Sequence, residues 1–296
     1  MADTEKQNIH SPKPRWLMRR LPSKPEYEMV RSLIAKGGLH TVCQEARCPN
    51  QFECFSCRTA TFLILGSRCT RNCGFCAIQH GLPDGPPDND EPRKVAQASA
   101  DMGLRYVVLT SVTRDDLADG GAGLFAQTIR EIRRKIPHAL TEVLIPDFQG
   151  DESALRTVLD AYPNVLNHNI ETVPQLYPAV RPQAIYERSL ELLRRVKKYS
   201  ADIPSKSGIM LGLGEKDGEV EQTLKDLFSA GCSFLTIGQY LRPSQKQLAV
   251  KRYVPPEEFD LWRERALQIG FAAVAAGPFV RSSYHADRMY RPASET

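Results

Sequence analysis

Six cysteines in the first third of the chain form two closely spaced triads. The first triad has the spacing C-x4-C-x5-C and consists of Cys43, Cys48 and Cys54. The second triad has the spacing C-x3-C-x2-C and consists of Cys69, Cys73 and Cys76. Thiolates are soft ligands that suit zinc and iron–sulfur clusters, so thiols gathered in this way indicate metal binding or redox chemistry.

A zinc ribbon is the simplest interpretation of part of this pattern. C-x2-C pairs at 54–57 and 73–76 have a separation that zinc ribbons use. However, the intervening stretch ATFLILG (60–66) is typical of a buried strand, and a ribbon leaves three cysteines of the triads without a role. Three thiolates in a tight loop after a strand fit a cluster of four irons better, with one iron open to chelate a small molecule.

The compartment in which the chain works bears on this choice. Its first residues, MADTEKQNIHSPKPRW, are polar and lack the apolar stretch of a signal peptide or membrane anchor, so we expect a cytoplasmic protein without a membrane partner. In that reducing compartment the 8 cysteines should not form a disulfide framework. A formal net charge of +4 is too small to indicate a nucleic-acid partner.

The remainder of the chain must position these thiols, and from Thr59 onward it alternates strand-like with helix-like segments. The expected strands are ATFLILG (60–66), RYVVLTS (105–111), ALTEVLI (139–145), NVLNHNI (164–170), KSGIMLG (206–212) and SFLTIGQY (233–240). Such alternation predicts a parallel sheet covered by helices. Periodicity alone leaves an open barrel and a doubly wound sheet as alternatives.

Helical stripes and a further apolar run complete the pattern. Apolar residues repeat at helical spacing in two segments, at Phe125, Ile129, Ile132 and Ile136 and at Val220, Leu224, Leu227 and Phe228. The run FAAVAAG (271–277) either covers the sheet or extends it. Residues 1–24, rich in Pro, Lys and Arg, are expected to be a mobile or surface-draped arm.

The second triad carries a family resemblance. A C-x3-C-x2-C motif with an aromatic residue, Phe75, before the last cysteine, on the loop after the first strand of a βα array, resembles the radical S-adenosylmethionine superfamily. The resemblance implies an α/β fold, a partial (β/α)6 TIM-type open barrel at residues 59–270. It also implies an N-terminal cluster-binding extension at 25–58 and a C-terminal covering segment, with the RSSY motif, at 271–296.

Within that superfamily, further stretches are similar to a sulfur-inserting branch. They are the first triad, TSVTRDDLADGG (110–121), NHNIETV (167–173), VRP (180–182), KSGIMLGLGE (206–215), LTIGQYLRPS (235–244) and RSSYHA (281–286). The similarity implies an enzyme that inserts two sulfur atoms, at C6 and C8, into an octanoyl chain on a lysine of a carrier protein. Two S-adenosylmethionine molecules are cleaved per product, and an auxiliary cluster donates the sulfur.

The same similarity implies the cofactors and partners. The cofactors are S-adenosylmethionine and two [4Fe-4S] clusters. The first cluster is bound by Cys69, Cys73 and Cys76, and the auxiliary cluster by Cys43, Cys48, Cys54 and a serine of RSSY, for which we choose Ser283 over Ser282. No other catalytic side chain is implied. The partners are octanoylated lipoyl carrier domains or the glycine cleavage H protein, and an electron donor such as ferredoxin or flavodoxin.

Contacts to S-adenosylmethionine are implied at three further positions. In NHNIET the strand period of two puts Asn167, Asn169 and Glu171 on one face near the end of a strand, where α/β barrels bind ligands. The family likeness gives Asn169 and Glu171 to the ribose hydroxyls and Arg181 to the carboxylate. A turn that satisfies its own backbone is the alternative for NHNIET. Asp115 and Asp116 either hold the cofactor's amino group or cap the helix that starts near Gly120.

Two other functions are consistent with some of these features. A different two-cluster radical enzyme, such as a methylthiotransferase acting on RNA or a ribosomal protein, would need an RNA-binding module that we do not find. A zinc-ribbon or electron-carrier protein would not need the long barrel-sized segment that follows the cysteines. Two cysteines stay outside both triads: Cys57 has no assigned role, and Cys232 is expected to be a small buried residue.

Overall fold

The structure is a computed structural model that describes residues 13–18 and 25–290. Most of the arm expected at residues 1–24, and the last six residues of the segment 271–296, lie outside the described residues. Within the arm, Arg15–Leu17 forms the short helix η1, in which Leu17 is buried. Among the described residues, no helix combines the length and the apolar character that a membrane crossing requires.

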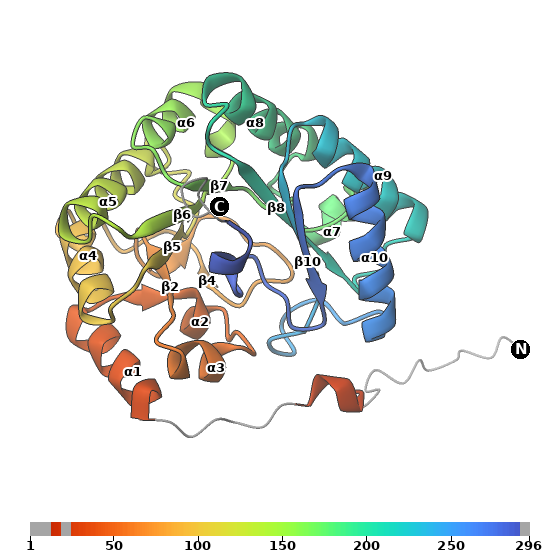
Figure 1. Cartoon of the computed structure of the whole chain (residues 1–296), viewed down its shortest axis with the longest axis horizontal. Coiled ribbons are helices and arrows are strands. Elements are labelled where there is room, and N and C mark those ends of the chain that lie inside the picture. The colour runs from red at the N-terminus through yellow and green to blue at the C-terminus, as the bar shows by residue number, and fades with distance from the viewer. Residues whose placement is uncertain (1–12, 19–24, 291–296) are drawn as a thin grey trace, which may run out of the picture.

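Within these residues one large sheet forms the centre of the molecule (Figure 1). Its strands, in spatial order, are β1 (His40–Thr41), β2 (Thr61–Ile64), β5 (Tyr106–Ser111), β6 (Leu140–Leu144), β7 (Val165–Asn167), β8 (Ser205–Leu211), β9 (Phe234–Gln239) and β10 (Ala273–Gly277). All neighbouring pairs are parallel except β1 with β2. The six predicted strands therefore exist, and the run 271–277 extends the sheet as a seventh parallel strand.

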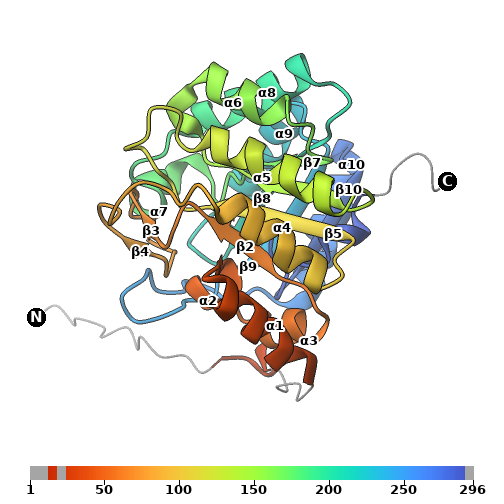
Figure 2. The same ribbon diagram turned by 90° about the vertical axis from the view of Figure 1, so that its left-hand side faces the viewer.

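Helices cover the outer face of this curved sheet (Figures 1 and 2). They are α4 (Glu91–Asp101), α5 (Ala122–Lys135), α6 (Glu152–Leu159), α8 (Tyr186–Tyr199), α9 (Asp217–Ser229) and α10 (Pro256–Ile269). The sheet curves without closing, because β1 and β10 are its two edges. The fold is thus the partial TIM-like barrel that the family resemblance implied, rather than a doubly wound sheet.

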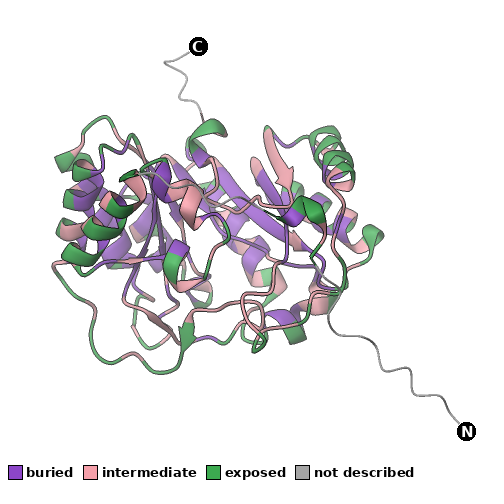
Figure 3. Ribbon diagram, turned by 90° about the horizontal axis from the view of Figure 1, so that it is seen from below, coloured by how far each residue is buried: buried purple, intermediate pink, exposed green. Residues whose placement is uncertain are grey.

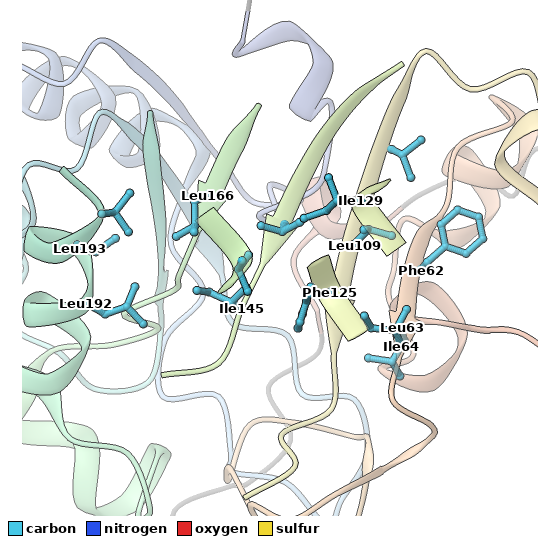
Figure 4. Close-up of a cluster of buried hydrophobic side chains, with 14 of the residues drawn as sticks. Phe62, Leu63, Ile64, Leu109, Phe125, Ile129, Ile145, Leu166, Leu192 and Leu193 are labelled. Atoms are coloured by element: carbon cyan, nitrogen blue, oxygen red, sulfur yellow. The ribbon is translucent and has the colours of Figure 1, made fainter. Parts of the chain in front are cut away.

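The hydrophobic core lies between the strands and these helices. Phe125 and Ile129 of α5 belong to the same buried cluster as Leu109 of β5 (Figure 4). Seen from below, most strands of the sheet are buried, β10 is of intermediate exposure, and the outer faces of the helices are exposed (Figure 3). Strands buried on both faces read as continuous apolar runs, which is why they could be found in the sequence. Phe228 departs from its predicted stripe: it is 42% exposed and packs at α9's end against Phe271.

An N-terminal extension adjoins the β2 edge of the barrel (Figure 1). It contains α1 (Pro25–Gly37), β1, α2 (Val42–Glu45) and α3 (Gln51–Ser56). Tyr27 of α1 stacks on Phe52 of α3 with ring centroids 5.1 Å apart, so the two helices hold each other in place. The two-residue strand β1 ties the extension to β2 through an antiparallel pairing that the sequence pattern did not predict.

Smaller elements lie at the two ends of the barrel. β3 (Arg68–Cys69) and β4 (Gln79–His80) form a separate parallel pair that brackets the second cysteine triad. The others are η2 (Phe148–Gly150), η3 (Pro174–Leu176), α7 (Tyr177–Val180) and η4 (Ala286–Arg288). After β10 the chain turns into the space enclosed by the sheet, where Figure 1 shows the C-terminal segment at the centre of the barrel.

A buried charged layer crosses the barrel interior. Lys206 of β8 donates to both carboxylate oxygens of Glu142 on β6, at 2.9 and 3.2 Å. Tyr106 and Asn167 donate to the same carboxylate at 2.7 and 3.2 Å. Both side-chain oxygens of the buried Glu142 are therefore hydrogen-bonded, which offsets the loss of their hydration. Asn167 belongs to this layer rather than to a face shared with Asn169 and Glu171.

Candidate functional site

A cavity of about 340 Å³ lies at the carboxyl ends of the parallel strands. Its lining includes the ten residues that the family likeness assigned to the clusters or to S-adenosylmethionine: Cys43, Cys48, Cys54, Cys69, Cys73, Cys76, Asn169, Glu171, Arg181 and Ser283. The carboxyl end of a parallel barrel is where loops from different strands converge on a ligand. Residues separated by up to 240 positions in the chain, from Cys43 to Ser283, are thus brought to one place.

The loop of the second triad is fixed by close backbone packing. Gly74 donates from its amide to the carbonyl of Val180 at 2.9 Å, and its carbonyl accepts from the amide of Leu248 at 2.9 Å. A Cβ at position 74 would lie 2.8 Å from the carbonyl oxygen of Ala179, so the site needs glycine for its small size. The loop is held against elements far along the chain and presents its three thiols to the cavity.

Arg71 provides a second anchor inside the same loop, between Cys69 and Cys73. Its guanidinium donates twice to Asp115, at 2.7 and 2.8 Å, and once to Asp147, at 2.6 Å. Arg71 is 6% exposed and the Asp147 side chain is fully buried. Burial alone would raise the pKa of Asp147, but the hydrogen bond and charge of Arg71 outweigh it and lower that pKa to about 2.

The first triad comes from the N-terminal extension. Cys43 is on α2 and Cys54 is on α3, with Cys48 on the turn between the two helices. Thr41 starts α2 as its N-cap and accepts from the amide of Gln44 at 3.3 Å. The short helices therefore turn the three thiols toward the cavity, whereas Cys57, at the C-cap of α3, is exposed and lies outside the cavity lining.

The chemistry of these donors fits iron–sulfur clusters. The pKa of Cys43 is raised to about 12, mainly by burial and next by the neighbouring thiol Cys48. Burial likewise raises the pKa of Cys76 to about 12. Thiols gathered in an apolar pocket resist ionisation until a cationic centre replaces their protons. Among the described residues, no three His, Cys, Asp or Glu side chains are close enough to hold a single metal ion.

Asn169, Glu171 and Arg181 form one hydrogen-bonded group on the wall of the cavity. Asn169 donates from its amide to Glu171 at 3.0 Å, and Arg181 donates to the backbone carbonyl of Asn169 at 3.0 Å. Glu171 has a left-handed backbone, with φ of +67°, and a backbone bridge to Ile209 of β8 holds it there. Burial raises the pKa of Glu171, although Arg181 and Asn169 act in the opposite direction.

Unpartnered polar atoms mark where a ligand would complete this group. Arg181 is 8% exposed, and its Nε has no partner although the other end of the guanidinium makes three hydrogen bonds. Ser111 Oγ and Asn50 Oδ1, both on residues that line the cavity, are also buried without partners. Because buried donors and acceptors are almost always satisfied, these atoms fit a polar ligand such as S-adenosylmethionine.

The C-terminal segment lines the cavity from inside the barrel and is held from two sides. Tyr284 donates to Glu53 at 2.7 Å, and Asn50 donates to the carbonyl of Phe279 at 2.7 Å, which ties the segment to α3. Ser282 donates to Asn169 at 2.9 Å, which ties it to the barrel. The hydroxyl of Ser282 is thus engaged with the barrel, and the assignment of Ser283 as a ligand stays a prediction.

Several expectations about individual residues resolve in the structure. Asp115 pairs with Arg71 and Asp116 with Arg114, so neither caps the following helix. Asp119 does so instead, accepting from the amides at positions 121 and 123 at 2.9 and 2.8 Å. Cys232 is buried, and its thiol donates to the backbone, as expected of a small structural residue.

Sequence reasoning missed the residues that anchor the site. Arg71 offered one signal, a basic residue between two cysteines of the C-x3-C-x2-C motif. Asp147 and Glu53 offered no signal, because their partners Arg71 and Tyr284 are 76 and 231 positions away in the chain. Long-range pairs of this kind leave no periodic pattern.

Comparison with known proteins supports the geometry. The radical SAM superfamily profile matches residues 63–227. Among solved structures, methylornithine synthase superposes with a TM-score of 0.55 at 13% identity, covering 91% of this chain and 89% of that one. The coproporphyrinogen III oxidase of Escherichia coli superposes with a TM-score of 0.51 at 13% identity, over 69% of this chain and 51% of that one. At such low identity these two likenesses show the fold alone.

Curated relatives are much closer in sequence. A lipoyl synthase of Desulfotalea psychrophila is 57% identical over 281 residues, which are 95% of this chain and 94% of that protein. A lipoyl synthase of Alkaliphilus metalliredigens is 53% identical over 274 residues, 93% of this chain and 94% of that protein. With near-complete coverage in both directions, the chain belongs to the lipoyl synthase family of the radical S-adenosylmethionine superfamily.

Proposed function

We propose that this protein inserts two sulfur atoms, at C6 and C8, into an octanoyl chain held on a lysine of a carrier protein, and so makes lipoyl-lysine. The observation that carries the proposal is the meeting of both cysteine triads, the RSSY segment and the group of Asn169, Glu171 and Arg181 on one cavity. A sulfur donor, a radical source and a substrate must be close together for such a reaction.

The substrate explains why such a cavity is needed. C6 and C8 of an octanoyl chain carry unactivated C–H bonds, which side-chain bases with conjugate-acid pKa values of roughly 4 to 14 cannot deprotonate. When bound, the two [4Fe-4S] clusters supply the electron that cleaves S-adenosylmethionine to a 5′-deoxyadenosyl radical and the sulfur that is inserted, with two S-adenosylmethionine molecules used per product.

The protein's own residues bind and orient these groups. We assign Cys69, Cys73 and Cys76 to the first cluster, and Cys43, Cys48, Cys54 and Ser283 to the auxiliary cluster. Arg181 would pair with the carboxylate of S-adenosylmethionine through its unpartnered side. Asn169 and Glu171 would hydrogen-bond the ribose hydroxyls. Apolar wall residues such as Val112, Leu144 and Met210 would contact the acyl chain and exclude water.

The partners and the division of the chain follow from this assignment. We propose octanoylated lipoyl domains or the glycine cleavage H protein as substrates, a ferredoxin or flavodoxin as electron donor, and the reducing cytoplasm as the site of action. Residues 25–58 would serve the auxiliary cluster and 59–270 the radical chemistry. The segment 271–296 would serve as the cover, although its first strand extends the sheet.

Iron and sulfide analysis after anaerobic reconstitution tests the assignment of cofactors. We expect about eight irons per chain, four for each triad, with equivalent acid-labile sulfide. Cys73→Ala should abolish formation of 5′-deoxyadenosine. Cys48→Ala should leave that cleavage largely intact and stop sulfur insertion. Equal loss of cleavage in both variants, or one zinc without sulfide, would overturn the proposal.

The serine ligand has its own test. Ser283→Ala should still load both clusters, because three thiolates suffice to hold each, but should yield little or no lipoyl product on an octanoylated domain. Ser283→Cys should load as well and also fail, because a fourth thiolate would hold its iron more firmly than a hard oxygen ligand does. Full product formation by Ser283→Ala would remove this residue from the ligand set.

A further inference from the structure

The two adjacent serines of the RSSY motif have different surroundings. Ser282 donates from its hydroxyl to Oδ1 of Asn169 at 2.9 Å, across 113 positions of sequence. Ser283 lines the same cavity and, within the part of the chain that the structure describes, makes no such contact. The hydroxyl of Ser282 therefore contacts the barrel wall, and the two serine hydroxyls are not interchangeable.

The Ser282 contact determines which way the Asn169 side chain points. An amide carries an acceptor on one side and donors on the other. With Oδ1 occupied by Ser282, the Nδ2 group faces Glu171, to which it donates at 3.0 Å. Ser282, Asn169 and Glu171 thus form a continuous chain of hydrogen bonds along the wall assigned to the ribose.

A glycine makes room for this junction. A Cβ built at Gly208 of β8 would lie 2.6 Å from Oγ1 of Thr236, 2.9 Å from Oδ1 of Asn169 and 3.1 Å from Oγ of Ser282. The backbone of Gly208 does not have the left-handed conformation that favours glycine, so the need here is for space. The side chains of β9, the β7 loop and the RSSY segment meet over this one position.

The remainder of the segment is anchored on the opposite side. Tyr284 donates to Glu53, and Asn50 donates to the carbonyl of Phe279, both at 2.7 Å. Residues 279–285, here called the strap, therefore connect the helix that carries Cys54 to the wall that carries Asn169. The strap is thus hydrogen-bonded to both halves of the site, and the bond from Ser282 to Asn169 contributes to its hold on the barrel half.

We propose that Ser282 is a positioning residue for S-adenosylmethionine, which orients the Asn169 amide and couples occupancy of that site to closure of the strap. The inference rests on the proposed function. Linkage is reciprocal. If the contact between Ser282 and Asn169 raises the affinity for S-adenosylmethionine by some factor, bound S-adenosylmethionine favours that contact, and with it the closed strap, by the same factor. Ser282 acts through Asn169 and does not itself contact the reacting atoms.

Equilibrium dialysis with labelled S-adenosylmethionine, on anaerobically reconstituted protein of verified iron content, tests this role. Ser282→Ala should weaken binding about three- to tenfold, the range expected from one lost hydrogen bond. Ser282→Thr keeps the hydroxyl and should bind within twofold of wild type. Ser153→Ala, on an exposed residue of α6 outside the cavity lining, should bind like wild type. Combining Ser282→Ala with Asn169→Ala should weaken binding no further than Asn169→Ala alone.

Hydrogen–deuterium exchange of peptides covering 279–285 gives a second readout that does not depend on turnover. In wild type, S-adenosylmethionine should slow exchange of the strap, and in Ser282→Ala this protection should be lost. If Ser282→Ala fails to load iron, Asn169→Ala breaks the same bond from the barrel side and should speed strap exchange.

The outcomes distinguish failure of the proposed function from failure of the positioning role of Ser282. A wild-type protein that does not bind S-adenosylmethionine overturns the proposed function. If wild type binds it and Ser282→Ala binds equally well, or if the two alanine variants are additive, the proposed function stands and the positioning role fails. Unchanged strap exchange in both Ser282→Ala and Asn169→Ala would equally remove the coupling.

Discussion

Replacing Asp147 by asparagine should destabilise the protein by removing one anchor of the second triad's loop. The carboxylate of Asp147 accepts from Arg71 at 2.6 Å, from the amide of Gln149 at 3.0 Å and from Arg188 at 3.4 Å. The neutral amide of the variant cannot pair with two arginines. Arg71 then keeps only its two hydrogen bonds to Asp115.

The magnitude follows from the pKa of Asp147. Arg71 lowers it from 3.8 to about 2, against the opposing effect of burial. At about 1.4 kcal/mol per pKa unit, this shift corresponds to about 2 kcal/mol of stability at pH 7. Complete loss of a buried ion-pair partner typically costs about 3–5 kcal/mol, and the surviving bonds to Asp115 reduce that figure. We therefore expect a loss of about 2–3 kcal/mol in the free energy of unfolding.

The pH dependence has a definite sign. Because the folded-state pKa lies below the ordinary value, the contribution is complete above about pH 4 and disappears as pH falls through the folded pKa near 2. The difference between wild type and Asp147→Asn should be constant between about pH 7 and 5 and smaller by about 1 kcal/mol at pH 3.

Urea unfolding of the reduced, cluster-free protein at several pH values measures these differences. Asp160→Asn makes the same chemical change on an exposed residue and should alter the free energy of unfolding by less than about 0.5 kcal/mol. A change below about 0.5 kcal/mol for Asp147→Asn at pH 7, or a difference independent of pH down to 3, would refute the reasoning.

Three further predictions concern other features. Gly208→Ala would place a Cβ 2.6 Å from Oγ1 of Thr236 and should weaken S-adenosylmethionine binding at least about tenfold in equilibrium dialysis, whereas Gly218→Ala, with nothing within 4 Å, should not. Lys206→Met should lower the free energy of unfolding by about 3 kcal/mol in urea titrations, and adding Glu142→Leu should restore most of it. Turnover on an octanoylated domain should fall as salt screens the attraction between a slightly basic enzyme and an acidic domain, and turnover on a short octanoyl-lysine peptide should change less; an equal response would contradict that attraction.

The strands could be predicted from the sequence because both of their faces are buried. Runs such as ATFLILG (60–66) are mostly apolar, and each one contains a strand of the sheet. The run FAAVAAG (271–277) stayed undecided because its small residues fit a covering segment as well as a strand. The two-residue strand β1 was missed because it is too short to show a period. Motif spacing found the cysteines, because ligand geometry constrains spacing directly.

The supports of the site could not be predicted in the same way. Arg71 and Asp147 meet only because the loops after β2 and β6 reach the same end of the barrel. Asn167 was placed with Asn169 by the strand period, yet β7 ends at Asn167, and the chain beyond it no longer alternates. Contacts that depend on where a strand stops need the three-dimensional structure.

The strap also sets an order of assembly during synthesis. Asn50 and Glu53 bind residues that lie 229 and 231 positions later in the chain. At about 5–20 residues per second, the ribosome completes the strap on the order of 10–50 s after the first triad. During that interval Cys43, Cys48 and Cys54 have been synthesised, but the strap residues that line the same cavity have not. The auxiliary side of the cavity is therefore completed last, when the strap that shares its lining has been synthesised.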